Sequence, residues 1–142
     1  DAVVGLITQR ESETVVRLVA SQNTLRGEPL PVYVQMFDNR LVYRKGAVVA
    51  SGRVDGRTSR EAIVASLFRL ADEAARGARG KVLSPPFTIV TTPPNAVVGI
   101  DDSQQAVRRL QQLHRSALVR VVTPEDIRTV GPLTVRFVVV ER

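Results

Sequence analysis

Apolar and polar positions alternate along several stretches of the chain, which is the pattern of half-buried β-strands. In residues 14–21, Val16 and Leu18 occupy one side of the expected strand, and Arg17 and Val19 occupy the other. Other stretches are apolar on both sides and predict buried strands. The predicted strands are residues 2–8, 14–21, 32–37, 40–44, 47–54, 87–90, 118–122 and 133–140.

Three of these strands, within residues 32–54, are closely spaced and predict an antiparallel meander. Asp38 and Asn39 separate the first from the second, and Lys45 and Gly46 separate the second from the third. Both pairs are typical of tight turns, because Asn and Gly tolerate left-handed backbone. We therefore expect each strand to pair with the next.

Two segments have the 3.6-residue period of amphipathic helices. The first begins at Thr58, with Glu61 at capping-box spacing, and ends at Gly77. The second begins near Asp102, which has the same spacing to Gln105. The order of elements predicts an α/β (α+β) fold, with a mixed sheet, an antiparallel meander and two helices.

Two parts of the chain match at an offset of 103 residues and predict an internal duplication. The matching parts, residues 14–34 and 117–137, each read as a strand, a long loop and a second strand. The alternative is two ordinary units of similar composition. The identities are Val16, Arg17, Val19, Pro29, Leu30 and Val32, which recur as Val119, Arg120, Val122, Pro132, Leu133 and Val135.

Composition narrows the class of protein. The length of 142 residues predicts one globular domain over residues 1–142, and a start at Asp1 instead of Met predicts a fragment of a longer chain. The chain has no Cys, which excludes disulfides and Cys-ligated metals. It has 20 Lys and Arg against 14 Asp and Glu, a net charge of +6, which permits an anionic partner.

Three runs resemble the C-terminal domain of an uncharacterised bacterial family of membrane-anchored coiled-coil proteins, a domain of unknown function. Residues 15–23 match V-V-R-L/I-V/L-A/S-x-x-N, and residues 129–136 match T-x-G-P-L-x-V/I-R. Residues 39–50 match N-x-L/V-V-F/Y-x-x-G-x-V/I-I/V/L-A. The resemblance implies a globular tail behind a membrane anchor and a coiled coil, and it transfers no catalytic residue.

The order of three strands, a helix, a strand, a helix and a strand is also similar to RNase H-like folds. Nucleases of that class hold two divalent cations with clustered carboxylates. The chain offers Asp38, Asp101, Asp102 and Asp126 as ligands for Mg²⁺ or Mn²⁺. However, Asp38 also suits a turn and Asp102 a helix cap, and the predicted strand at residues 87–90 contains no acid.

Basic residues form three groups that would contact a phosphate backbone if they shared one face. Tyr43 is the only aromatic residue among them, which argues against single-strand binding. The groups are Arg40, Arg44 and Lys45; Arg53, Arg57 and Arg60; and Arg76, Arg79 and Lys81.

The sequence favours a non-enzymatic binding or assembly module at the C-terminal end of a coiled-coil protein, with self-association and no cofactor. One alternative is a nucleic-acid-binding domain that contacts the phosphate backbone. A second alternative is an RNase H-like, metal-dependent nuclease. We expect a bacterial protein whose full length is membrane-anchored, with this domain soluble, cytoplasmic and without membrane contact of its own.

Overall fold

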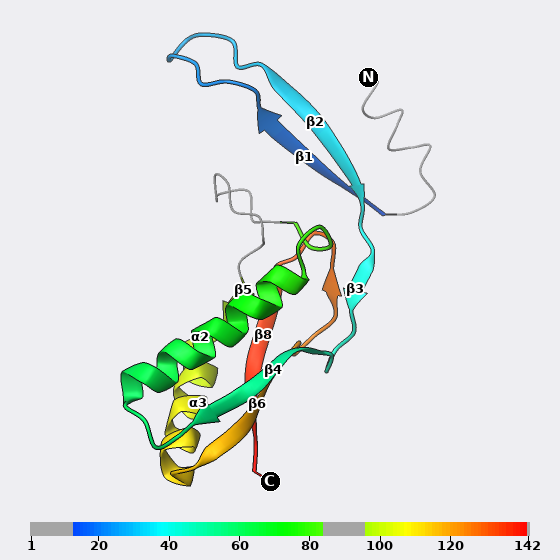
Figure 1. The fold of residues 1–142 in the computed structure, drawn as a ribbon. Helices are drawn as coiled ribbons and strands as arrows, with labels where there is room; N and C mark the ends of the chain where they lie inside the picture. Colours follow the sequence, from blue (N-terminus) through cyan, green and yellow to red (C-terminus); the bar gives the residue numbers. More distant parts are fainter. Residues whose placement is uncertain (1–12, 84–95, 142) are drawn as a thin grey trace. The chain divides into compact units, whose positions relative to one another are not determined.

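The computed structural model describes residues 13–83 and 96–141 (Figure 1). The strands predicted at residues 2–8 and 87–90 lie outside the described residues. The described ranges combine helices with antiparallel and parallel strand pairs, which confirms the predicted α+β class.

The chain divides into two compact units, residues 1–40 and 41–142. In the first unit, β1 (Thr14–Ala20) and β2 (Val32–Asp38) form an antiparallel hairpin along their whole length. Among residues 13–83 and 96–141, these two strands pair with each other and with no other strand, which accounts for the separate unit. The connection between them is closed by Ser21, whose backbone N and Oγ both donate to the carbonyl of Pro31, at 3.0 and 3.1 Å.

The second unit contains a four-stranded sheet in the order β4-β6-β8-β5. β4 (Val48–Asp55), β6 (Ser116–Val122) and β8 (Leu133–Val140) are antiparallel neighbours. β5 (Ala96–Val98) runs parallel to β8.

Helices α2 (Arg60–Gly77) and α3 (Ile100–Leu113) pack on one face of this sheet. A separate short pair is formed by β3 (Leu41–Tyr43) and β7 (Ile127–Arg128). The core lies between the sheet and the two helices, since alternate residues of the strands are buried there. Its members include Val119, Val121, Leu133 and Val135 from the sheet, Ile63, Leu67, Leu70 and Ala74 from α2, and Val107 and Leu110 from α3.

The predicted meander is wrong. β2 pairs with β1, β3 with β7, and β4 with β6. The turn at Lys45 and Gly46 exists, but Gly46 N donates to the carbonyl of Thr123 at 2.7 Å, and Thr123 N donates to the carbonyl of Ala47 at 3.0 Å. These bonds fix the turn to the end of β6, so β4 continues along β6. The similarity to RNase H-like folds, which is drawn from the order of elements in the sequence, stays a prediction.

The start of α2 differs from the prediction by one residue. The N-cap is Ser59, whose Oγ accepts from Ala62 N at 3.2 Å. Thr58 Oγ1 instead donates to the carbonyl of Asp55 at 2.8 Å. The capping box predicted for Thr58 and Glu61 is therefore wrong.

The capping box predicted at the start of α3 is also wrong. Its N-cap is Gly99, with no side-chain cap. Asp101 and Asp102 lie in the first turn of the helix, where carboxylates interact favourably with the positive end of the helix dipole.

The two predicted repeat arms have the same strand register. All five partner pairs of β6 and β8, shifted back by 103 residues, are partner pairs of β1 and β2. For example, Leu18 opposite Val34 becomes Val121 opposite Phe137. A slip of one residue would turn every side chain to the other face, so the equal register means that equivalent residues share equivalent faces.

A substitution at Gly56 tests the packing between the β4–α2 turn and α3. A Cβ atom on Gly56 would lie 2.1 Å from the carbonyl oxygen of Leu110, so Gly56→Ala requires a backbone shift. We expect it to lower the free energy of unfolding by about 1–3 kcal/mol. Gly77→Ala is the control, because nothing lies within 4 Å of its Cβ position. Thermal unfolding of both variants checks the prediction, and wild-type stability of Gly56→Ala would contradict it.

Candidate functional site

One face of the β1–β2 hairpin exposes apolar side chains. The exposed fractions are 41% for Val16, 68% for Leu18, 48% for Val32 and 36% for Val34. Alternation along each strand and the pairing of Leu18 with Val34 place all four on one face. Soluble monomers rarely expose large continuous apolar patches, so this face is a candidate protein-binding surface. We call these four residues the bare face.

The residues equivalent to the bare face form the core of the second unit. At an offset of 103 they lie in β6 and β8, on the side covered by α2 and α3. Three of the four are at most 2% exposed there, and the fourth packs against the core. The same strand pair is thus covered in one unit and uncovered in the described part of the other. The equivalent pairs are Val16 and Val119, Leu18 and Val121, Val32 and Val135, and Val34 and Phe137.

The acids predicted as metal ligands take part in local structure. Asp38 forms an ion pair with Arg40 at 3.0 Å, and Asp126 Oδ1 accepts from Lys45 N at 2.8 Å. Asp101 and Asp102 occupy the first turn of α3. Among the described residues, no group of three or more His, Cys, Asp or Glu could hold a metal ion. The nuclease alternative therefore gains no support from these positions.

The first predicted basic group is divided between the two units. Arg40 belongs to the first unit, whereas Arg44 and Lys45 follow β3 in the second. The sequence predicts a strand over residues 40–44, but β3 covers only Leu41–Tyr43, so Arg40 and Arg44 both lie outside it.

The other two predicted basic groups lie at opposite ends of α2. Arg60 is the first residue of this 18-residue helix, and Arg76 lies in its last turn, with Arg79 and Lys81 beyond. A rise of 1.5 Å per residue separates the helix ends by about 27 Å. Arg76 is also paired with Asp72, at 2.7 Å. These groups do not make one compact site.

Arg57 is bound to a carboxylate in the turn before α2. Its Nε and Nη2 donate to the two carboxylate oxygens of Asp55 at 2.9 and 3.1 Å, and its backbone N donates to Oδ1 at 2.9 Å. These hydrogen bonds from Arg57 lower the pKa of Asp55. The hydrogen bond to Asp55 in turn raises the pKa of Arg57. Arg57 is thus part of the turn that precedes the helix.

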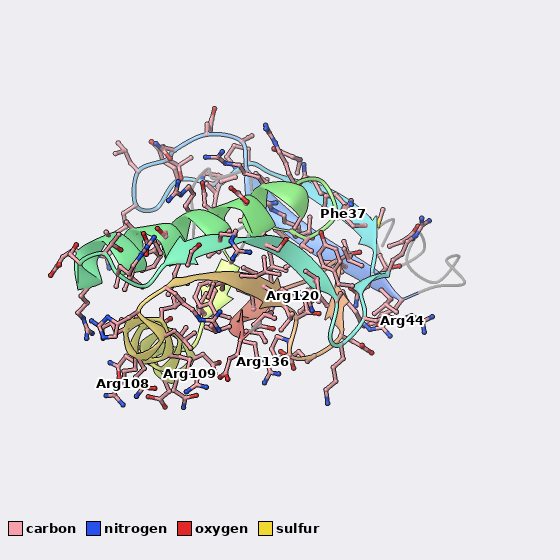
Figure 2. All side chains as sticks on the ribbon, turned by 60° about the horizontal axis from the view of Figure 1, so that its bottom comes forward. Phe37, Arg44, Arg108, Arg109, Arg120 and Arg136 are labelled. Carbon is pink, nitrogen blue, oxygen red and sulfur yellow. The ribbon has the colours of Figure 1, made fainter. Side chains whose placement is uncertain are left out.

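The strand register places three arginines on a diagonal across the sheet face opposite the helices, and Figure 2 labels two of them, Arg120 and Arg136. They are Arg53 on β4, Arg120 on β6 and Arg136 on β8, and all three are exposed. Arg53 lies opposite Leu118, two residues before Arg120, and Arg120 lies opposite Val138, two residues after Arg136. Diagonal neighbours of this kind are about 7–8 Å apart. We call these residues the arginine diagonal.

The sequence prediction includes Arg53 but misses Arg120 and Arg136 as binding residues. Each is the single charged residue of a mainly apolar strand, and this was the available signal. In the part of the chain that the structure describes, the ion pairs involve other arginines. Arg53 donates to Ser116, through Nε to Oγ at 3.4 Å and through Nη2 to the carbonyl oxygen at 3.5 Å.

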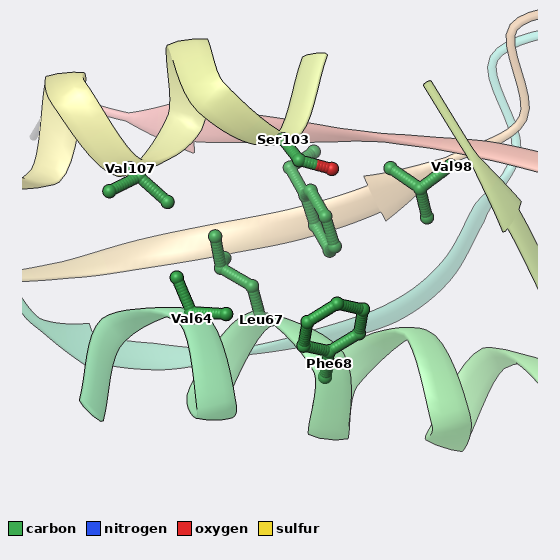
Figure 3. A pocket seen from close by; sticks show the side chains of 7 residues that line it. Val64, Leu67, Phe68, Val98, Ser103 and Val107 are labelled. Atoms are coloured by element: carbon green, nitrogen blue, oxygen red, sulfur yellow. The ribbon is translucent and has the colours of Figure 1, made fainter. Parts of the chain in front are cut away.

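A small apolar cavity lies between α2 and α3 (Figure 3). Its volume is about 80 Å³, well below the roughly 300–1,000 Å³ of ligand pockets. It has no charged side chain in its lining, and Phe68 is 68% exposed. The cavity suits one apolar side chain rather than a metabolite. It is lined by Val64, Leu67, Phe68, Val98, Ser103, Val107 and Phe137.

Comparisons with protein-family models, curated proteins and solved structures found no match for the chain. In the described ranges, every helix is too short or too polar to cross a membrane. The resemblance to the coiled-coil family remains a prediction.

The Asp55–Arg57 contact predicts a change in the pH dependence of stability. Because the pKa of Asp55 is lowered in the folded state, its contribution is present above the unfolded pKa of about 3.9 and is lost as the pH falls through the folded value. We expect Arg57→Gln to raise the pKa of Asp55 toward its ordinary value, as measured by NMR titration of the carboxyl carbon. Arg60→Gln is the control, and an unchanged Asp55 titration in Arg57→Gln would contradict the assignment.

Proposed function

We propose that the chain is a non-enzymatic binding and assembly module that joins other proteins through the β1–β2 hairpin. The observation that carries the proposal is the bare face, because its equivalents in β6 and β8 are core residues. Burial of apolar surface is worth about 25 cal/mol per Å², so covering this face favours association.

Among the described residues, the hairpin lacks the flanking strands and covering helices that stabilise strands in a sheet. An isolated two-stranded hairpin is marginally stable in water, and more strands or a helix are needed for independent stability. In the second unit, the equivalent strands are flanked by β4 and β5 and covered by two helices. Among the described residues, β1 and β2 have no such strand neighbours. A protein partner would supply the missing contacts.

A second candidate function is contact with a phosphate backbone, and the arginine diagonal favours it. Guanidinium groups bind phosphate oxygens with two parallel hydrogen bonds. The three side chains project from one sheet face, and the register fixes their spacing. Phosphate contacts carry no base information, so such binding would be independent of sequence.

The bare face predicts self-association, because another copy supplies the available protein surface in a pure preparation. We expect wild-type chain to form concentration-dependent oligomers in sedimentation velocity. Leu18→Asp places a charge in the contact and should weaken association at least about tenfold, since burial of a Leu side chain is worth about 1.5–3 kcal/mol.

The matched control is Gln35→Asp, which adds the same charge on the opposite face of the hairpin. It should associate like the wild type. A wild-type chain that stays monomeric at high concentration, or a Leu18→Asp variant that associates normally, would overturn the proposed function.

The arginine diagonal predicts salt-dependent binding of duplex DNA. The logarithm of the affinity should fall with the logarithm of the salt concentration, by about 0.9 for each phosphate contacted. Arg120→Ala and Arg136→Ala should each reduce this slope by about 0.9 and weaken all sequences equally in fluorescence anisotropy. Arg76→Ala, which removes a charge already paired with Asp72, should leave the slope unchanged. Absence of binding at low salt would exclude this second function.

A further inference from the structure

We infer that the β1–β2 hairpin is half of a second copy of the sheet-and-helix layer seen in residues 41–142, and that its bare face takes up an amphipathic helix of the α2 type. This inference rests on the proposed function and names the partner of the same surface. The occupant is a helix with a stripe of Ile, Leu and Ala side chains.

The two strand pairs, β1–β2 and β6–β8, agree in sequence pattern and in register. One offset of 103 residues relates the identities in the sequence and the partner pairs in both hairpins. Two ordinary strand–loop–strand units of similar composition would have no reason to share the register, which a single partner pair fixes for the whole hairpin. The two hairpins are therefore equivalent in structure as well as in sequence pattern.

In the second unit, helices cover the equivalent strand pair, β6 and β8. In the second unit, α2 packs on β4, β6 and β8 through Ile63, Leu67, Leu70 and Ala74, which recur at the spacing of one helix face. On β4, the strand beside this pair, the contact is close, because a Cβ atom on Gly52 would lie 2.8 Å from Leu70 Cδ2. On β6 and β8 themselves, Val119, Val121 and Val135 share one buried core with residues of α2 and α3. A strand pair with this side-chain pattern is thus packed by a helix in this protein.

The bare face is apolar at the same positions as the covered copy. Three of its four positions carry Val or Leu where the covered copy carries Val, and the fourth carries Val where the covered copy carries Phe. Every substitution between the copies keeps the position apolar. The bare face therefore has the side chains needed to receive a stripe like that of α2, and exposed fractions of 36–68% show that the described residues leave it accessible.

A face-to-face pair of hairpins from two copies would bury the same residues. The covered copy in the second unit favours the helix, since both α2 and α3 occupy that face there. The two occupants compete for one surface, so a helix that binds the bare face should dissolve oligomers formed through it.

The test uses a synthetic peptide with the sequence of residues 59–78, cross-linked between positions 61 and 65, which are exposed in α2, so that it is already helical. We expect saturable binding of one peptide per chain in calorimetry, and conversion of oligomers into a one-chain, one-peptide complex in sedimentation. Leu18→Asp should weaken peptide binding at least tenfold, and Gln35→Asp should leave it unchanged. A peptide carrying Leu67→Asp and Leu70→Asp should not bind.

The outcomes separate this inference from the proposed function. If Leu18→Asp abolishes self-association but the helical peptide does not bind, the hairpin is an assembly surface for a partner other than a helix, and the inference fails. Equal peptide binding to Leu18→Asp and wild type places the contact elsewhere and also overturns it. A wild type that stays monomeric at high concentration overturns the proposed function itself, whatever the peptide does.

Discussion

The two-residue period of paired strands is the constraint on which the rest of the structure depends. In β6 and β8, one set of alternate residues, including Val119 and Val135, is buried against the helices. The other set includes Arg120 and Arg136, which remain exposed on the opposite face. Since the register fixes both sets together, the same pairing creates the core and the arginine diagonal.

The described residues of the first unit show what the same constraint produces where none of them forms a helix over the strands. β1 and β2 keep the pairing of β6 and β8, but residues such as Leu18 are exposed where Val121 is fully buried. Backbone hydrogen bonds within a hairpin do not require a core, whereas its apolar face does. The pairing and the burial of a strand are therefore separate properties, and only the first is local to the hairpin.

Features encoded by nearby residues could be predicted from the sequence, and features that depend on distant residues could not. Alternation locates β1, β6 and β8, and the apolar stripe of α2 locates that helix. The partner of β3 is a two-residue strand, β7, which is too short to give a periodic signal. The predicted meander is wrong for a related reason: tight turns indicate where strands end, but they do not indicate which strand each one pairs with.

The arginine diagonal and the bare face also differ in how far the sequence alone could predict them. Grouping basic residues by sequence finds neighbours such as Arg44 and Lys45, but the members of the arginine diagonal are 67 and 16 residues apart and meet only through the register of three strands. The bare face was within reach of the sequence, because the offset of 103 relates it to the strands of the core. The sequence does not show which of the two copies is buried and which is exposed. Two copies of one strand pair, one covered and one bare, provide an internal comparison, and the difference between them indicates the kind of surface that the bare copy accepts.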